Sequence, residues 1–173
     1  ALWAGPLCSH LLQRCGFQVI KVESLQRPDG AREGSPKHFH ALHEEKEFRR
    51  FDFRDPTDLR RLRMLLASAD VVIEGSRPRA LRALALDRES IMTTAGSAAA
   101  ASHLWLSLTA YGRASPFGDW VGFGDDVAIA AGAFDGSEAN APEFIADAIA
   151  DPLTGLLSAV LILELRRRRM SGL

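Results

Sequence analysis

Asp151 is the residue whose type and position best suit covalent chemistry. It precedes Pro152 and an apolar stretch that runs to Leu165. Aspartate before proline is a common helix start, so Asp151 is predicted to be an N-cap whose carboxylate faces the free amides of the next turn. That setting favours the ionised form, which can attack an activated acyl group without a base to remove a proton. A purely structural N-cap is the simpler interpretation.

Two other groups of side chains invite a chemical interpretation. Asp147 is the rival carboxylate, but the residues that follow it lack the Pro-Leu-Thr-Gly pattern that follows Asp151. The histidines at 38, 40 and 43 match no common structural metal site, and no cysteine joins them. We therefore expect a polar loop there and no metal.

Composition indicates a single globular domain. The chain has 173 residues, of which 47% are hydrophobic and 25% charged, enough to build a core. A net charge of −1 gives no general attraction for nucleic acid or an anionic membrane. Cys8 and Cys15 lie on one predicted helix face, which suits buried thiols and a reducing cytoplasm better than a disulfide framework.

The ends of the chain and its apolar runs bear on location and completeness. Residues 152–165 form the longest strongly apolar run, which is too short to span a bilayer. No charged-then-apolar leader opens the sequence, so we expect neither membrane insertion nor secretion. The sequence starts without Met inside an apolar pattern and stops after an Arg run, so we expect it to be a fragment of a longer protein.

Hydrophobic periodicity predicts strands that alternate with helices. The predicted strands cover residues 17–22, 51–54, 70–74 and 104–108, and the helices cover 6–15, 56–68, 79–86, 87–93 and the stretch from 152. A polar connection, Ser24 to Glu47, is long enough to predict a functional or mobile loop. The alternation predicts an α/β fold, a Rossmann-like doubly wound and mostly parallel sheet with flanking helices. Ligands of such sheets bind beyond the carboxyl ends of the strands, here near Val22, Arg54, Gly75 and Thr109.

Several short segments share an order and spacing with a known family. They are Ala4-Gly5-Pro6, Val19 to Glu23, Arg32, Asp70 to Glu74, Arg77-Pro78, Thr109 to Gly112, and Asp151-Pro-Leu-Thr-Gly155. Together they resemble the class III CoA-transferase family, which includes carnitine and bile-acid CoA-transferases and 2-methylacyl-CoA racemases. The resemblance spans nearly the whole chain, 1–173, as the N-terminal portion of the family's large domain.

The resemblance implies a site and a mechanism. Asp151 takes the place of the family's nucleophile, which forms aspartyl-acyl anhydride and aspartyl-CoA thioester intermediates while CoA passes between carboxylic acids. Coenzyme A and acyl-CoA are then substrates, and no cofactor stays bound. Backbone amides and a few cations would hold CoA. The positions that the resemblance assigns to CoA are Trp3, Ala4, Arg32, Phe51, Arg54, Gly75, Ser76, Arg77, Gly122, Phe123, Gly124 and Asp125.

Two departures from the family pattern leave alternatives open. Phe123 stands where the racemase branch has a histidine, and phenylalanine cannot carry a proton, so transferase activity is favoured over racemase activity. Family members are more than twice as long and form interlocked homodimers. A non-catalytic CoA-binding or dimerisation module is therefore the second hypothesis.

Overall fold

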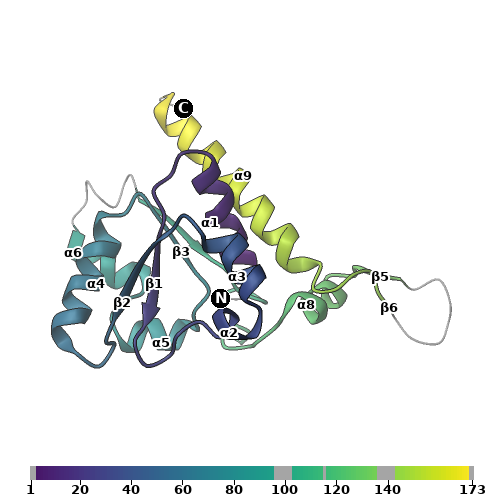
Figure 1. The fold of residues 1–173 in the computed structure, drawn as a ribbon, viewed down its shortest axis with the longest axis horizontal. Coiled ribbons are helices and arrows are strands. Elements are labelled where there is room, and N and C mark those ends of the chain that lie inside the picture. Colours follow the sequence, from purple (N-terminus) through teal and green to yellow (C-terminus); the bar gives the residue numbers. More distant parts are fainter. Residues whose placement is uncertain (1–2, 96–102, 115, 136–142, 172–173) are drawn as a thin grey trace.

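The protein has an α/β fold, as the sequence predicted (Figure 1). The computed structural model describes residues 3–95, 103–114, 116–135 and 143–171. The helices are α1 (Ala4–Arg14), α2 (Ala31–Gly34), α3 (Pro36–His43), α4 (Pro56–Ser68), α5 (Pro78–Ala83), α6 (Arg88–Ala95), α8 (Gly124–Ala130) and α9 (Ala150–Met170). The strands are β1 (Ile20–Ser24), β2 (Glu47–Phe51), β3 (Val71–Glu74), β4 (Leu104–Ser107), β5 (Phe134–Asp135) and β6 (Glu143–Phe144).

The four longer strands pair in parallel. β1 pairs with β2 from Ile20–Glu47 to Ser24–Phe51, and β3 pairs with β4 from Val71–Leu104 to Glu74–Ser107. Hydrogen bonding therefore gives two parallel ladders where the sequence predicted one sheet. The short strands β5 and β6 pair with each other in antiparallel orientation, a pairing that the sequence did not predict.

Apolar side chains cover both sides of these strands. Val71 and Ile73 of β3 pack with a buried cluster formed by α1 and α9. A second cluster joins β1 and β2 to α4 and α5, around the buried Leu62. In Figure 1, α1 and α9 lie on one side of the strands and α4 and α6 on the other. Helices on both faces of parallel strands are the doubly wound arrangement.

Local signals placed several helix ends correctly. The Asp55 side chain accepts a hydrogen bond from the Thr57 amide at 2.9 Å, so Asp55 is the N-cap of α4 and the helix begins at residue 56 as predicted. Gly16 has φ of 88°, the left-handed conformation that glycine commonly adopts just after a helix, and α1 ends near the predicted boundary at residue 15. Cys8 is buried as expected, whereas Cys15 is exposed at the C-cap of α1 and corrects the prediction of two buried thiols.

The region between β1 and β2 corrects the sequence prediction. The expected loop from Ser24 to Glu47 contains the helices α2 and α3. Phe39, Leu42 and His43 are buried along one face of α3, an i, i+3, i+4 pattern that the polar composition obscured.

The strand predicted at 51–54 instead ends at Phe51. Asp52 turns the chain there, because its carboxylate accepts from the Arg54 amide and its own amide donates to Asp58, both at 2.8 Å.

Among the described residues, no helix combines the length and apolar character of a membrane span.

The first turns of α1 and α9 approach each other closely because Gly155 has no side chain. A Cβ atom at Gly155 would lie 2.8 Å from the Ala4 carbonyl oxygen and 3.1 Å from the Leu7 side chain. The carbonyl belongs to the helix backbone and cannot move aside without shifting α1. Gly155 therefore sets the distance between the two helices.

We expect Gly155→Ala to destabilise the fold, although alanine is favoured over glycine in a helix by about 1 kcal/mol. The clash with Ala4 should outweigh that gain and lower the free energy of unfolding by about 1–3 kcal/mol in urea denaturation. Thr154→Ala, at the exposed neighbouring position, is the matched control and should leave stability nearly unchanged. An equal or higher stability for Gly155→Ala would show that the helices are not in tight contact.

Candidate active site around Asp151

Asp151 lies in the first turn of α9 and is not its N-cap. The helix starts at Ala150 with Ile149 as N-cap, and the Asp151 amide already donates to the Ala148 carbonyl at 2.9 Å. The sequence prediction of an N-cap was therefore wrong by two residues, because a turn before Asp151 starts the helix. Its side chain is left free to interact with other elements.

The Asp151 carboxylate accepts backbone hydrogen bonds from Ala4, at the start of α1, and from Gly124, at the start of α8. Three helix N-termini thus meet at one carboxylate. Burial raises the pKa of Asp151 above 3.8, the two backbone bonds oppose that rise, and the nearby charge of Asp125 adds to it. The net direction is upward, which corrects the prediction that the helix mouth alone would favour the ionised form.

Asp125 holds the turn that precedes α9. Its carboxylate accepts a hydrogen bond from the Ala148 amide at 2.5 Å, and Ala148 has φ of 48°, a left-handed conformation that is unusual for alanine. A Cβ atom at Gly124 would lie 2.5 Å from the Ala148 carbonyl oxygen. Only glycine at position 124 lets α8 approach this turn, so Gly124 and Asp125 fix where α9 begins.

The carboxyl ends of β3 and β4 lie beside the same helix starts. A Cβ atom at Gly75, just after β3, would lie 3.7 Å from the Leu108 carbonyl oxygen, and one at Gly5 would lie 3.2 Å from the Leu108 side chain. A Cβ atom at Gly122 would lie 2.7 Å from Ala110. The structure therefore groups five predicted positions at one edge of the fold: Ala4, Gly75, Gly122, Gly124 and Asp125.

An ion pair at the ends of β3 and β4 was not predicted from the sequence. The Arg113 guanidinium lies 2.6 Å from the Glu74 carboxylate and donates to the Ser107 hydroxyl at 2.8 Å. It ties the loop after β4 to both strand ends. One signal in the sequence could have indicated such ion pairs. An acidic residue ends each of two apolar strands, Glu23 after Val22 and Glu74 after Ile73.

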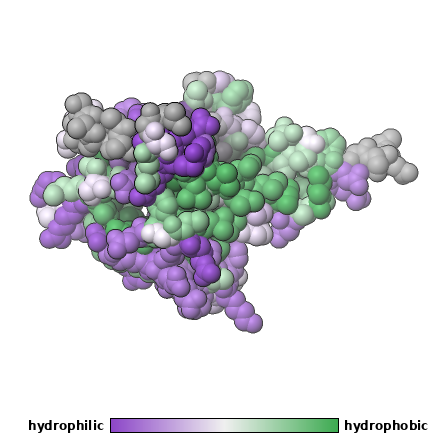
Figure 2. All heavy atoms as spheres, turned by 90° about the horizontal axis from the view of Figure 1, so that it is seen from above, coloured by the Kyte–Doolittle hydropathy of each residue, from purple (hydrophilic) through white to green (hydrophobic). Residues whose placement is uncertain are grey.

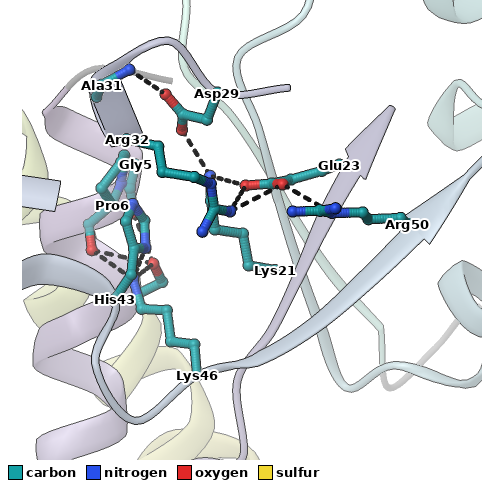
Figure 3. Close-up of polar contacts among 11 residues, drawn as sticks. Gly5, Pro6, Lys21, Glu23, Asp29, Ala31, Arg32, His43, Lys46 and Arg50 are labelled. Atoms are coloured by element: carbon teal, nitrogen blue, oxygen red, sulfur yellow. Dashed lines mark hydrogen bonds and ion pairs between the residues drawn. The ribbon is translucent and has the colours of Figure 1, made fainter. Parts of the chain in front are cut away.

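Arg32 of α2 is held at the carboxyl end of β1 (Figure 3). Its guanidinium donates to both oxygens of the buried Glu23, at 2.9 and 3.0 Å, and lies 4.4 Å from the centre of the Phe39 ring. Arg50 approaches the same carboxylate from β2 at 3.6 Å. The Arg32 Nε atom is buried and has no hydrogen-bond partner in the described structure. Arg32 is therefore held by Glu23 and Phe39, with its buried Nε donor unused.

The remaining predicted CoA positions differ in exposure. Phe51 is buried against Leu62 and is a core residue. Trp3 packs edge-on against His38, with ring centres 5.5 Å apart. The others lie at the surface near the ends of β2 and β3 or before α8, and they are Arg54, Ser76, Arg77 and Phe123.

The competing chemical interpretations find little support. Asp147 is exposed, whereas Asp151 is partly buried among helix starts. Among the described residues no group of three or more His, Cys, Asp and Glu is placed to hold a metal ion. His40 instead pairs with Glu44, and His43 contacts Lys46.

Comparison with known proteins identifies the family. The sequence matches CoA-transferase family III over residues 1–173, so the chain belongs to this family. It is 28% identical to a succinate–glutarate CoA-transferase of Agrobacterium fabrum over 90% of this chain and 41% of that protein. It is also 28% identical to a succinyl-CoA–D-citramalate CoA-transferase of Chloroflexus aurantiacus over 99% of this chain and 44% of that protein.

Solved structures agree with that assignment. A hypothetical protein of Mycobacterium tuberculosis superposes with a TM-score of 0.84 at 27% identity, covering 98% of this chain and 48% of the other. A CAIB/BAIF family protein from Brucella suis gives 0.81 at 30% identity, covering 99% and 47%. The chain thus spans less than half the length of the relatives it matches.

We expect Asp125→Asn to lower the pKa of the Asp151 carboxyl, because the negative charge of Asp125 raises that pKa and the substitution removes the charge. The asparagine oxygen can still accept from the Ala148 amide, so the turn should be kept. Carbon-13 NMR titration of the carboxyl groups measures the change directly. Asp147→Asn, at an exposed neighbouring position, is the control, and an equal shift in both variants would contradict a local effect.

Proposed function

We propose that this protein is an acyl-CoA:carboxylate CoA-transferase with Asp151 as its covalent nucleophile. The observation that carries the proposal is the position of the Asp151 carboxylate, partly buried between the backbone amides of Ala4 and Gly124. Membership in CoA-transferase family III and the names of both curated relatives support it.

The proposed reaction exchanges acyl groups through Asp151. The carboxylate attacks the thioester carbonyl of acyl-CoA, and the carbon–sulfur bond breaks. CoA departs as its thiolate, and the acyl group stays bound to Asp151 as a mixed anhydride. The thiolate then attacks the aspartyl carbonyl, which releases the first carboxylic acid as its carboxylate and forms an aspartyl-CoA thioester. An acceptor carboxylate attacks this thioester and expels the thiolate. The thiolate finally attacks the acceptor's carbonyl in the new anhydride, giving the new acyl-CoA and free Asp151.

The surroundings of Asp151 suit this chemistry. Burial and the charge of Asp125 raise the pKa of Asp151, and a more basic carboxylate is the stronger nucleophile once ionised. Hydrogen bonding from the Ala4 and Gly124 backbone acts on the carboxylate whose charge is withdrawn and restored during each step.

The proposed CoA site extends from Asp151 along the carboxyl ends of the strands. Gly75 and Gly122 allow backbone to approach the ligand closely, and the exposed Arg54 and Arg77 supply cations for phosphates. Arg32 adds a partly exposed guanidinium at the carboxyl end of β1, where Glu23 holds it. Ordered backbone amides and a few arginines are what a polyphosphate ligand requires.

Racemase activity is the less favoured alternative, because Phe123 is 62% exposed directly before Gly124 and offers no proton carrier. Deuterium entering the α-position of a 2-methylacyl-CoA as fast as turnover would overturn that preference.

A non-catalytic CoA-binding module is the other alternative. A cytoplasmic location stays a prediction from the two free cysteines.

We also propose that the protein self-associates through an exposed apolar face (Figure 2). The figure shows hydrophobic residues gathered in a continuous area that runs from the middle of the molecule toward the end carrying β5 and β6. On α9 the exposed members of this face are Leu153, Leu156, Leu157, Val160 and Leu161. Such areas on soluble proteins usually mark an interface, and a second copy of the chain is the proposed partner.

We expect a covalent adduct on Asp151 when the protein is incubated with an acyl-CoA and then with hydroxylamine. Hydroxylamine attacks the activated aspartyl group, so peptide mass spectrometry should find a hydroxamate at Asp151. Asp151→Asn should abolish the adduct and Asp147→Asn should not. A hydroxamate at Asp147 would contradict the assignment.

The Asp151→Asn variant should fold. The pKa of Asp151 is higher in the folded than in the unfolded state. The contribution of the protonated carboxyl to the stability of the fold is therefore present at low pH and is lost as pH rises through the folded pKa. At neutral pH the charged group opposes folding, and asparagine removes that charge. Thermal unfolding at pH 7 should show equal or higher stability, and loss of folding would favour a structural role.

We expect light scattering at several concentrations to give a mass above 18.9 kDa, rising with concentration. Leu157→Glu places a charge in the apolar face and should reduce the mass toward the monomer. Met64→Glu, on the exposed side of α4, is the control and should not. A monodisperse monomer with a cooperative melt in the unsubstituted protein would overturn the proposed interface.

A further inference from the structure

Lys46 lies between α3 and β2 with its ammonium group inside the protein (Figure 3). Only 6% of the residue is exposed. The ammonium lies 2.9 Å from the Pro6 carbonyl oxygen, 2.8 Å from the Ser9 hydroxyl and 3.2 Å from Nδ1 of His43. A lysine charge is costly to bury unless its donors are satisfied, and here three acceptors match its three N–H groups.

The charges around Lys46 are consistent with this arrangement. Burial lowers the pKa of His43 to about 3, so its ring is neutral and can accept from Lys46. Burial also lowers the pKa of Lys46 to about 7, with Lys21 of β1 adding to that effect and Cys8 of α1 opposing it. The three acceptors therefore hold the amine in place although the site is poorly solvated.

The groups that Lys46 contacts belong to the first turns of α1. Ser9, which accepts from Lys46, shares its single O–H between the carbonyl oxygens of Gly5 and Pro6, at 2.9 and 3.1 Å. Gly5 directly follows Ala4, whose backbone binds the Asp151 carboxylate. Lys46 thus binds α1 from the α3 side, and its contact with Pro6 lies two residues from Ala4, the backbone group that reaches the proposed nucleophile.

The opposite sides of this turn are also in contact with the fold. Gly155 of α9 packs against the Ala4 carbonyl, and the Leu108 side chain lies beside Gly5. The hydrogen bonds of Lys46 oppose a shift of the turn away from α3, and the backbone contact at Gly155 opposes a shift toward α9. Contacts on two sides of the turn therefore fix the position of the Ala4 amide.

We propose that Lys46 is a positioning residue for Asp151: it holds the first turn of α1 so that the Ala4 amide donates to the Asp151 carboxylate. The inference rests on the proposed role of Asp151 as nucleophile. Lys46 touches no reacting atom in this role. It acts through the α1 backbone, and nothing in the reaction requires its proton.

The test compares Lys46→Met with Lys37→Met, the same substitution at an exposed position of α3. Methionine keeps the length of the side chain and removes its donors. In Lys46→Met the Ala4 amide should exchange with deuterium faster, and the pKa of Asp151 should rise because a hydrogen bond that lowers it is weakened. The rate of hydroxamate formation should fall about 10- to 100-fold, as expected for a misplaced donor. Lys37→Met should change none of these.

Ser9→Ala provides a milder variant in case Lys46→Met fails to fold. It removes one acceptor of Lys46 and the hydroxyl's contacts with the turn. Amide exchange at Ala4, the pKa of Asp151 and the rate of hydroxamate formation should therefore change in the same directions by smaller amounts. If either folded variant loses stability while Ala4 exchange and the pKa of Asp151 stay unchanged, Lys46 is structural only and the proposal is overturned. Amide exchange and NMR titration need no turnover, so this outcome is distinct from a failure of Asp151 as nucleophile.

Discussion

The close contact between the first turns of α1 and α9 is the constraint on which the candidate site depends. Gly155 allows the α9 backbone to approach Ala4, and this approach brings the Asp151 carboxylate to the Ala4 amide. Gly124 allows a similar approach of α8 to the turn before α9. Two residues without side chains therefore determine where a carboxylate can receive amides from separate helices.

This geometry sets the electrostatics of Asp151. Helix N-termini carry partial positive charge and free amides, which favour an anion. Burial and the adjacent Asp125 act in the opposite direction and prevail, so the pKa of Asp151 is raised. A carboxylate that is held by donors yet poorly solvated is suited to repeated attack and release at a carbonyl carbon. The same amides would be far less effective in open solvent.

Much of the fold could be predicted from local patterns. The apolar strands around Val22 and Val72, the Asp55 N-cap and the Gly16 helix end all depend on residues within a few positions of one another. The region from Ser24 to Glu47 was predicted wrongly because its helices are held by distant partners. Arg32 binds Glu23, nine residues away, and Lys46 binds Pro6 across forty. A polar composition does not reveal such buried pairs.

The sequence by itself determined the family and the identity of the candidate nucleophile, since the order of short segments up to Asp151-Pro-Leu-Thr-Gly155 is a one-dimensional property. Only the tertiary structure decided the surroundings of that residue. A capping rule considers the amides of the following turn, whereas the amides that reach Asp151 come from Ala4 and Gly124. The sign of the pKa shift followed from burial and from the charge of Asp125, both consequences of packing between segments far apart in the chain.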